Sequence, residues 1–218
     1  FEVMFRHAIL LLLAVSATSA TLGFDAEQAI STSVFTCLKG QGYSFYISRI
    51  WRSNGAFDNT GVQNIKNAHA AGLAHVDAYI FPCTKSSCAT ASAQVEAAIN
   101  SLKSSGASIG QIWLDVEIYQ WPSDKTKNRQ FVLDMVNQAT KMGYKVGIYT
   151  NANNWSEIVG SDWTGVSSHQ LWWARYNSHA DLTTNWASFG GWSKPAIHQY
   201  TGDVTGPCGV GKWDQNFY

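Results

Sequence analysis

The segment Ile112-Trp113-Leu114-Asp115-Val116-Glu117-Ile118 decides the fold, because it predicts a buried β-strand with two carboxylates on one face. Side chains two residues apart in a strand project from the same face, so Asp115 and Glu117 are expected to point together. The opposite face then carries the apolar side chains of Leu114, Val116 and Ile118. An apolar face of this kind suits packing against helices, so the segment predicts one strand of a helix-covered sheet.

Similar apolar runs alternate along the chain with stretches of helical composition, which is the pattern of β/α units around a parallel sheet. We expect eight strands, at Leu22 to Glu27, Tyr43 to Trp51, His75 to Cys83, Ile109 to Ile118, Lys145 to Asn151, His169 to Asn177, Pro195 to Asp203 and Trp213 to Tyr218. Helices are expected at Ser31 to Lys39, Val62 to Ala71, Ala89 to Ser105 and Lys125 to Met142, with a shorter one at Asn153 to Val159. The connections to the last three strands contain no comparable helical stretch. The fold class is therefore α/β, a TIM-like barrel that is irregular in its final third.

The first twenty residues have the composition of a secretory signal peptide. Met4 is the expected start, residues 8–15 form an apolar run, and the small residues at 16–20 suit signal peptidase. The apolar run is too short for a bilayer, which needs about 20 residues. We expect residues 1–20 to be removed and residues 21–218 to form a single secreted domain without a membrane segment.

The charge balance excludes several classes of function. The chain has 15 basic and 15 acidic residues, and a nucleic-acid-binding protein is normally basic. The histidines show no metal-ligand spacing, and the chain has no glycine-rich phosphate loop, so neither a metal nor a cofactor is expected. Any action on an anionic cell wall should come from a specific cleft rather than from net charge.

Four cysteines remain in an exported chain, which favours two disulfides over free buried thiols. Three pairings are possible. Because Cys83 and Cys88 would close a short loop, we pair these two and assign Cys37 to Cys208.

Two further acids occupy corresponding places on the expected strands. Asp25 lies near the end of the first strand and Asp214 lies on the last. The first and last strands of a closed barrel are neighbours, so Asp25 and Asp214 should approach each other, and the reactive groups of such barrels lie at the carboxyl ends of the strands. Crowded, poorly solvated carboxylates raise the pKa of at least one member, and glycoside cleavage needs a carboxylic acid that is neutral near the working pH.

The chain resembles glycoside hydrolase family 25, the Chalaropsis-type lysozymes, over essentially its whole mature length. The matching segments, in chain order, are Gly23-Phe24-Asp25, Trp113-Leu114-Asp115-Val116-Glu117, Gly147-Ile148-Tyr149-Thr150, Leu171-Trp172-Trp173-Ala174-Arg175-Tyr176, Gln199-Tyr200-Thr201 and Asp214-Gln215-Asn216. The resemblance implies a (β/α)₅(β)₃ barrel and hydrolysis of the bond between N-acetylmuramic acid and N-acetylglucosamine in bacterial peptidoglycan. We expect a monomer that digests, or defends against, bacteria.

The resemblance also implies roles for the four acids. Glu117 would be the general acid, Asp115 the carboxylate that orients the substrate's acetamido group or stabilises positive charge, and Asp25 and Asp214 supporting acids. Whether the acetamido group or a water molecule attacks is left open at this stage.

Four residues are candidate substrate contacts. Tyr79 and Tyr149 lie far along their expected strands, Trp172 lies near a strand end, and Gln199 belongs to a matching segment. Many family members have Tyr-His-Phe where this chain has Tyr79-Ile80-Phe81, which places one polar contact in doubt. Arg49 and Arg175 are candidate partners of the acids, and His198 is interpreted as a core residue with satisfied hydrogen bonds.

Two alternatives come from different functional classes. One is a barrel that binds sugar without cleaving it, or acts as a regulator; such proteins usually lose the acid, whereas this chain keeps all four carboxylates. The other is a chitinase-like glycosidase, which would normally show a longer run of spaced aspartates before the glutamate than Asp115-Val116-Glu117.

Overall fold

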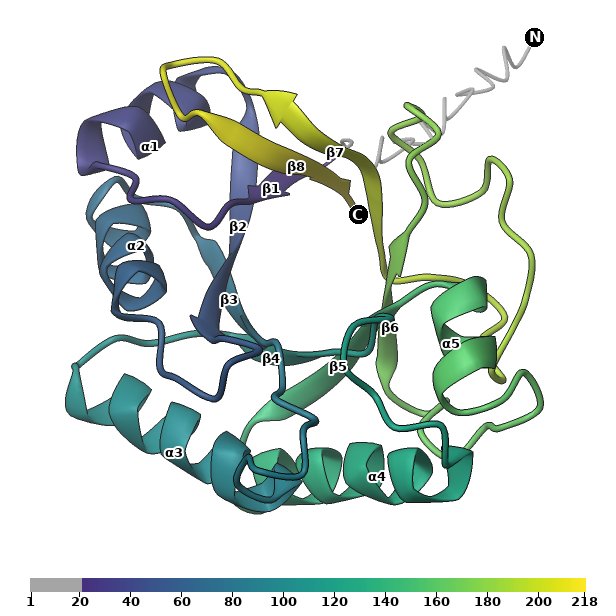
Figure 1. The fold of residues 1–218 in the computed structure, drawn as a ribbon. Helices are drawn as coiled ribbons and strands as arrows, with labels where there is room; N and C mark the ends of the chain where they lie inside the picture. The colour runs from purple at the N-terminus through teal and green to yellow at the C-terminus, as the bar shows by residue number, and fades with distance from the viewer. Residues whose placement is uncertain (1–20) are drawn as a thin grey trace, which may run out of the picture.

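Each apolar run becomes one strand of a closed barrel whose strands follow the order of the chain (Figure 1). The structure is a computed structural model that describes residues 21–218, so the expected signal peptide lies outside the described residues. The strands are β1 (Leu22–Asp25), β2 (Tyr43–Trp51), β3 (His75–Ile80), β4 (Gln111–Asp115), β5 (Lys145–Thr150), β6 (Gln170–Ala174), β7 (Ile197–Thr205) and β8 (Lys212–Phe217).

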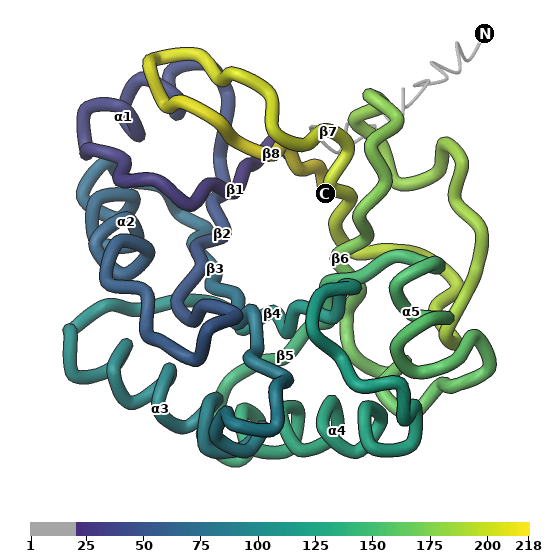
Figure 2. Tube along the Cα trace, in the orientation of Figure 1, coloured from purple at the N-terminus to yellow at the C-terminus, as the bar shows by residue number. Residues whose placement is uncertain are grey.

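Five helices cover the outside of the barrel along its first six strands (Figure 2). They are α1 (Thr32–Gly40), α2 (Asn59–Ala70), α3 (Ala91–Ser104), α4 (Lys125–Lys141) and α5 (Ala152–Ile158). Four begin at a residue whose side chain accepts a hydrogen bond from a backbone N–H of the first turn: Ser31, Thr90, Asp124 and Asn151. No helix connects the described residues of β6, β7 and β8. The barrel confirms the predicted fold class, including its irregular final third.

The last strand runs against its two neighbours. Strands β1 to β7 pair in parallel, whereas β8 is antiparallel to both β7 and β1. The start of β8 therefore lies beside the end of β1, and Asp214 is the direct partner of Asp25 in the sheet register. The expected approach of these two acids is confirmed.

The barrel has two apolar cores. The larger one lies between strands and helices, and the predicted helix faces contribute to it, for example Val95, Ile99 and Leu102 of α3, all fully buried. The second core fills the barrel interior with large side chains: Phe45, Ile47, Tyr79, Trp113, Tyr149, Trp172, Ala174 and Ile197. Because this interior layer is packed, the barrel has two separate ends.

Several strands are shorter than predicted, and for β4 this matters. The strand ends at Asp115, so Glu117 lies in the connection that follows and not on the strand itself. Leu114 and Val116 are buried in the outer core as expected, but the prediction for Ile118 was wrong, since 52% of this residue is exposed. By residue 118 the chain has left the sheet, so strand alternation no longer governs which way a side chain points.

Both predicted disulfides are confirmed. Cys83 pairs with Cys88, and Cys37 of α1 pairs with Cys208 in the turn between β7 and β8. Among residues 21–218, no helix combines the length and the apolar character needed to span a bilayer.

Candidate active site

A cavity of about 230 Å³ lies at the carboxyl ends of the parallel strands. Its lining includes all four predicted carboxylates and all four predicted substrate contacts: Asp25, Tyr79, Asp115, Glu117, Tyr149, Trp172, Gln199 and Asp214. These residues are far apart in the sequence and come from seven strands or the segments that follow them. The barrel thus gathers the predicted site into one place.

Gln199 of β7 joins the acids to the tyrosines. Its side-chain Nε2 donates to Asp25 Oδ1 at 2.9 Å and to Asp214 Oδ2 at 3.3 Å. Its Oε1 accepts from the hydroxyls of Tyr149 at 2.7 Å and Tyr176 at 3.1 Å. The amide is 1% exposed, and its two N–H groups and both acceptor positions are engaged within the protein. These bonds indicate that Gln199 positions the acids and tyrosines, and its contact with substrate stays a prediction.

Asp25 and Asp214 form a crowded pair of acids. Asp25 Oδ1 also accepts from Asn216 Nδ2 at 2.7 Å, and Asp214 Oδ1 accepts from the backbone N–H of Asp203 at 2.7 Å. Burial, and then the charge of Asp214, raise the pKa of Asp25. Burial also raises the pKa of Asp214, to about 6. Two neighbouring acids that are shielded from water resist ionising together.

Asp115 is the most deeply placed acid on this side of the cavity. It is 4% exposed, and its Oδ1 has no hydrogen-bond partner among the described residues. Burial raises its pKa well above the usual range, and the charges of Glu117 and Asp25 add to that effect. An unpartnered buried carboxyl oxygen is costly, so Asp115 offers a hydrogen-bonding position to a molecule that enters the cavity.

The backbone around Glu117 is held in place although the strand has ended. Glu117 O accepts from Trp121 Nε1 at 2.9 Å, and on either side Val116 N donates to Tyr149 O at 2.9 Å and Ile118 N to Asn154 Oδ1 at 3.3 Å. The Glu117 side chain itself makes no hydrogen bond or ion pair with any of residues 21–218. The backbone at residue 117 is therefore held in place, while the carboxyl group of Glu117 has no protein partner and can exchange a proton with a bound molecule.

Burial raises the pKa of Glu117 to about 6, with further contributions from the negative charges of Glu27 and Asp214. An acid with this pKa is largely protonated under mildly acidic conditions and still exchanges its proton readily. Burial, together with the charges of Glu27 and Asp214, thus gives Glu117 the raised pKa that general acid catalysis requires.

The aromatic candidates differ in what they can offer. Tyr79 is 7% exposed, and its hydroxyl makes no hydrogen bond within the described part of the chain, so it is free for a ligand. The hydroxyl of Tyr149 is engaged with Gln199. Trp172 is 2% exposed, and its Nε1 donates to Asn216 Oδ1 at 2.7 Å. Trp172 therefore forms part of the packed base of the cavity. Little of its ring is exposed for a sugar to stack on.

Sequence reasoning missed four residues of the cavity: Glu27, Phe81, Tyr176 and Asp203. Glu27 had a detectable signal, because Asp25-Ala26-Glu27 repeats the Asp-x-Glu spacing of Asp115-Val116-Glu117. Asp203 had none, since it reaches the cavity through a backbone with positive φ of 54° in β7. With these two residues the cavity is lined by six acids.

Of the two arginines predicted to pair with the acids of the cavity, Arg49 does so and Arg175 does not. Arg49 forms ion pairs with Glu27 and, at 2.8 Å, with Asp58. Arg175 is exposed and takes part in no ion pair among residues 21–218. Ile80 stands where many family members have a histidine. It lies in the outer core, so a polar side chain at this position would not reach the cavity.

His198 is a core residue, as interpreted from the sequence. It is fully buried, its ring nitrogens lie 2.5 Å from Asp181 O and 2.8 Å from Arg175 O, and it stacks on Trp173 at 4.2 Å. It is not among the residues that line the cavity. No group of three or more potential metal ligands is found in the part of the chain that the structure describes.

A longer groove of about 840 Å³ continues from the cavity and shares Glu117, Tyr149 and Tyr176 with it. Its walls are rich in amide side chains, from Asn151, Asn153, Asn154, Asn177 and Asn185. Glu117 thus lies where a small, acidic cavity meets an open groove that is rich in amide side chains. This arrangement suits a polymer that lies along the groove with one bond beside Glu117.

Comparisons with known proteins agree with this geometry. A family model described as Lysozyme-like protein 1 matches residues 16–200. The chain is 51% identical over 203 residues to Lysozyme-like protein 5 of Caenorhabditis elegans, covering 93% of this chain and 94% of the relative. It is 38% identical over 200 residues to Probable GH family 25 lysozyme 2 of Dictyostelium discoideum, covering 92% of each. The solved structure of a family GH25 lysozyme from Aspergillus fumigatus has the same fold, with a TM-score of 0.67 at 19% identity, covering 92% of this chain and 94% of that one.

Proposed function

The chain belongs to the glycoside hydrolase family 25 lysozymes, and from that membership we propose that it cleaves the β-1,4 bond between N-acetylmuramic acid and N-acetylglucosamine in bacterial peptidoglycan. Glycoside cleavage of the lysozyme type is common to the family. The bond, the polymer and the roles of individual residues are the content of the proposal.

The observation that carries the proposal is the state of Glu117. Its backbone is held by neighbouring hydrogen bonds, its carboxyl group has no protein partner, and its pKa is raised to about 6. A general acid must hold a proton until the glycosidic oxygen takes it, and Glu117 is placed and tuned to do so. As the bond breaks, that proton moves from the Glu117 carboxyl to the leaving oxygen.

Asp115 then has the second role. Its buried Oδ1 lacks a hydrogen-bond donor, and the acetamido N–H of an N-acetylated sugar would supply one. A carboxylate that holds this N–H orients the acetamido oxygen toward the anomeric carbon and favours attack by that oxygen, followed by hydrolysis with water. The unpartnered Oδ1 supports acetamido assistance over direct attack by water, a choice that the motif alone left open.

Asp25, Asp214 and Gln199 support this chemistry without touching the broken bond. Gln199 fixes the two acids and ties them to Tyr149 and Tyr176. The negative charge of Asp214 contributes to the raised pKa of Glu117. The groove beside Glu117 would hold the glycan strand through its asparagine side chains. Secretion, and a role in digesting or resisting bacteria, complete the proposal.

The proposal is tested by comparing Glu117→Gln with Glu96→Gln, in which an exposed glutamate of helix α3 is changed in the same way. Clearing of a bacterial cell-wall suspension should be lost in Glu117→Gln and retained in Glu96→Gln, while both variants unfold at similar temperatures. Retained clearing by Glu117→Gln would remove Glu117 from the role of acid. Greater activity on chitin than on peptidoglycan would instead favour a chitinase-like enzyme.

A further inference from the structure

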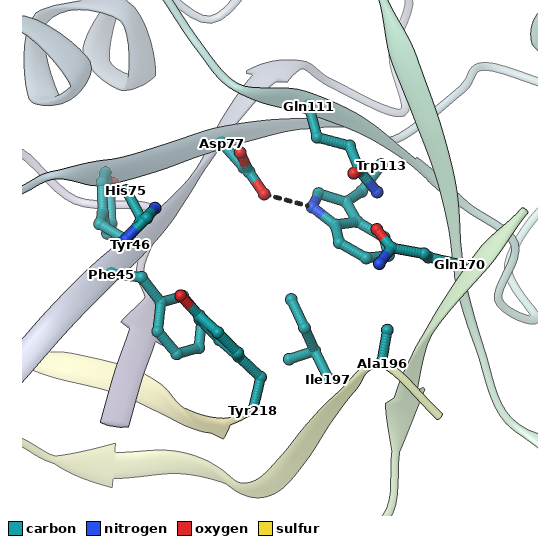
Figure 3. Close-up of a pocket in the computed structure, with 10 residues that line it drawn as sticks. All are labelled: Phe45, Tyr46, His75, Asp77, Gln111, Trp113, Gln170, Ala196, Ile197 and Tyr218. Carbon is teal, nitrogen blue, oxygen red and sulfur yellow. Dashed lines mark hydrogen bonds between the residues drawn. The ribbon is translucent and has the colours of Figure 1, made fainter. Parts of the chain in front are cut away.

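A second cavity, of about 190 Å³, opens at the opposite end of the barrel (Figure 3). Strand β4 connects the two ends, because its first residue, Gln111, lines this cavity and its last, Asp115, lines the acidic one. Trp113, halfway along β4, also lines the second cavity, and its ring contacts that of Trp172 at 5.9 Å. Trp172 lines the acidic cavity, so these two packed indoles lie between the cavities. The second cavity is a separate place in the molecule.

The second cavity contains a buried hydrogen-bond donor without a partner. Gln111 is 8% exposed, and its Nε2 makes no hydrogen bond with any of residues 21–218. Side-chain amides buried in a protein nearly always have their N–H groups satisfied, because an unsatisfied one costs about 1 to 3 kcal/mol. Gln111 Nε2 thus offers a hydrogen-bond donor to a molecule that enters this cavity.

An acceptor lies next to Gln111, on the neighbouring strand β3. Asp77 of β3 points toward Trp113, and its Oδ2 accepts from Trp113 Nε1 at 2.9 Å, the interaction drawn in Figure 3. The carboxyl group also accepts a backbone hydrogen bond from Gln111, and its two oxygens together keep lone pairs for a further donor. A bound molecule therefore meets a donor from Gln111 and an acceptor from Asp77.

Apart from His75 and Gln170, the remaining walls are aromatic or apolar. Phe45 and Tyr218 pack with ring centroids 4.9 Å apart, and together with Trp113 and Ile197 they surround the opening in Figure 3. Pockets for drug-sized ligands measure about 300 to 1,000 Å³, so a cavity of about 190 Å³ suits a single ring.

Gly147 of β5 leaves space for the side chains of Trp113 and Gln111. A Cβ at Gly147 of β5 would lie 2.3 Å from the Trp113 ring and 2.6 Å from Gln111 Nε2. Any side chain at position 147 would thus displace the indole wall and the unpartnered amide together. The glycine is what allows both groups to take their places at the cavity.

We propose that the second cavity is a binding site for one neutral sugar ring, distinct from the cleft that would cut the polymer. Each hydroxyl of a sugar both donates and accepts, so one ring can satisfy Asp77 and Gln111 at once, while its C–H face packs on Trp113 or Tyr218. An organic cation would satisfy Asp77 and the aromatic rings but would leave Gln111 Nε2 without an acceptor. A site of this kind would let the enzyme hold a glycan at one end of the barrel while cleaving at the other.

The test is an NMR titration of the ¹⁵N-labelled protein with N-acetylglucosamine, with glucose, and with tetramethylammonium as the cationic probe. We expect both sugars to shift the signals of the Gln111 side-chain amide and the Trp113 indole N–H, and tetramethylammonium to leave them unchanged. Gln111→Met keeps the length of the side chain but removes its donors, and should weaken sugar binding at these signals about tenfold. Gln130→Met, on the exposed face of helix α4, should bind as the unaltered protein does.

Three results would overturn the proposal: sugar-induced shifts confined to the acidic cavity, undiminished binding by Gln111→Met, or shifts produced by tetramethylammonium and not by sugars. Clearing of cell walls by Gln111→Met at the normal rate would show that this variant folds, so that weaker binding could not be attributed to unfolding. Sugar binding at the second cavity and clearing of cell walls by the acidic cavity are measured separately. A protein without the second site would still clear cell walls, so failure of this proposal would leave the proposed function standing.

Discussion

At the scale of single residues, Glu117 owes its behaviour to its neighbours. Burial contributes most to its raised pKa, and the negative charges of Glu27 and Asp214 contribute the rest. In the proposed mechanism, the protonated form of Glu117 donates to the glycosidic oxygen. Its fraction is high below the pKa and falls tenfold for each pH unit above it.

This predicts the alkaline side of the pH profile. Activity, measured as kcat/KM on a soluble peptidoglycan fragment, should fall as the pH rises through about 6. Glu27→Gln removes a negative charge beside Glu117, which lowers the pKa of Glu117 and should move this limb of the profile to lower pH. Glu96→Gln should leave the limb in place. Unchanged profiles for both variants would show that Glu27 does not influence the acid.

Gln199 gives a second prediction at this scale. Gln199→Leu leaves Asp25 and Asp214 without their shared donor and the hydroxyls of Tyr149 and Tyr176 without their acceptor. Because the amide positions other groups, kcat should fall about tenfold to a hundredfold with KM changed little. A rise in KM alone would mean that Gln199 contacts the substrate, which was the original expectation.

The acids of the site could be predicted from the sequence because they lie near the ends of predicted strands, and an acidic residue at such a place is a candidate reactive group. Asp25, Asp115, Glu117 and Asp214 were found in this way. The roles of Gln199 and Asp203 could not be, since one depends on a hydrogen-bond network across β7 and β8 and the other on an unusual backbone angle. Neither leaves a periodic signal in the sequence.

At the scale of elements, helix α2 packs unusually close to β2. A Cβ at Gly61 would lie 1.6 Å from the carbonyl oxygen of Arg49, and backbone atoms cannot move aside as a flexible side chain can. The close approach lets Ser48 Oγ donate to Gly61 O at 2.9 Å. It also fixes the strand that carries Arg49, the partner of Glu27.

Gly61→Ala should therefore destabilise the protein by about 1 to 3 kcal/mol or more, as overpacking does, although alanine is the better helix former. Gly40→Ala, at the last residue of helix α1, is the matched control, because a Cβ there meets no atom within 4 Å. Chemical denaturation measures both changes. Equal stability of the two variants would contradict the close packing of α2 on β2.

The helices agreed with their sequence predictions to within a few residues because capping side chains and buried faces mark them locally. The strands did not agree as well. The ends of β3 and β4 depend on where the neighbouring strand stops pairing, so the apolar run continues past the sheet and the exposed Ile118 looked like a strand residue. Pairing between distant segments is not visible in either segment alone.

At the scale of the whole molecule, the barrel closes through β8, and a disulfide reinforces the closure. Cys37–Cys208 joins residues 171 positions apart, whereas Cys83–Cys88 joins residues five apart. A cross-link restricts the unfolded chain more when it closes a longer loop.

Removing the long link should therefore cost more stability than removing the short one. Chain-entropy estimates are about 5 kcal/mol for a loop of this length and about 2 kcal/mol for the short loop. Replacing each pair by serines and measuring the free energy of unfolding checks the order. A larger loss from Cys83→Ser with Cys88→Ser would contradict it.

The central claim is that the acidic cavity cuts peptidoglycan on one side of N-acetylmuramic acid, with Glu117 giving the proton. Mass analysis of the fragments released from purified peptidoglycan tests it most directly. The account predicts fragments that end in reducing N-acetylmuramic acid, produced by the unaltered protein and by Glu96→Gln but not by Glu117→Gln. Fragments that end in reducing N-acetylglucosamine would contradict it.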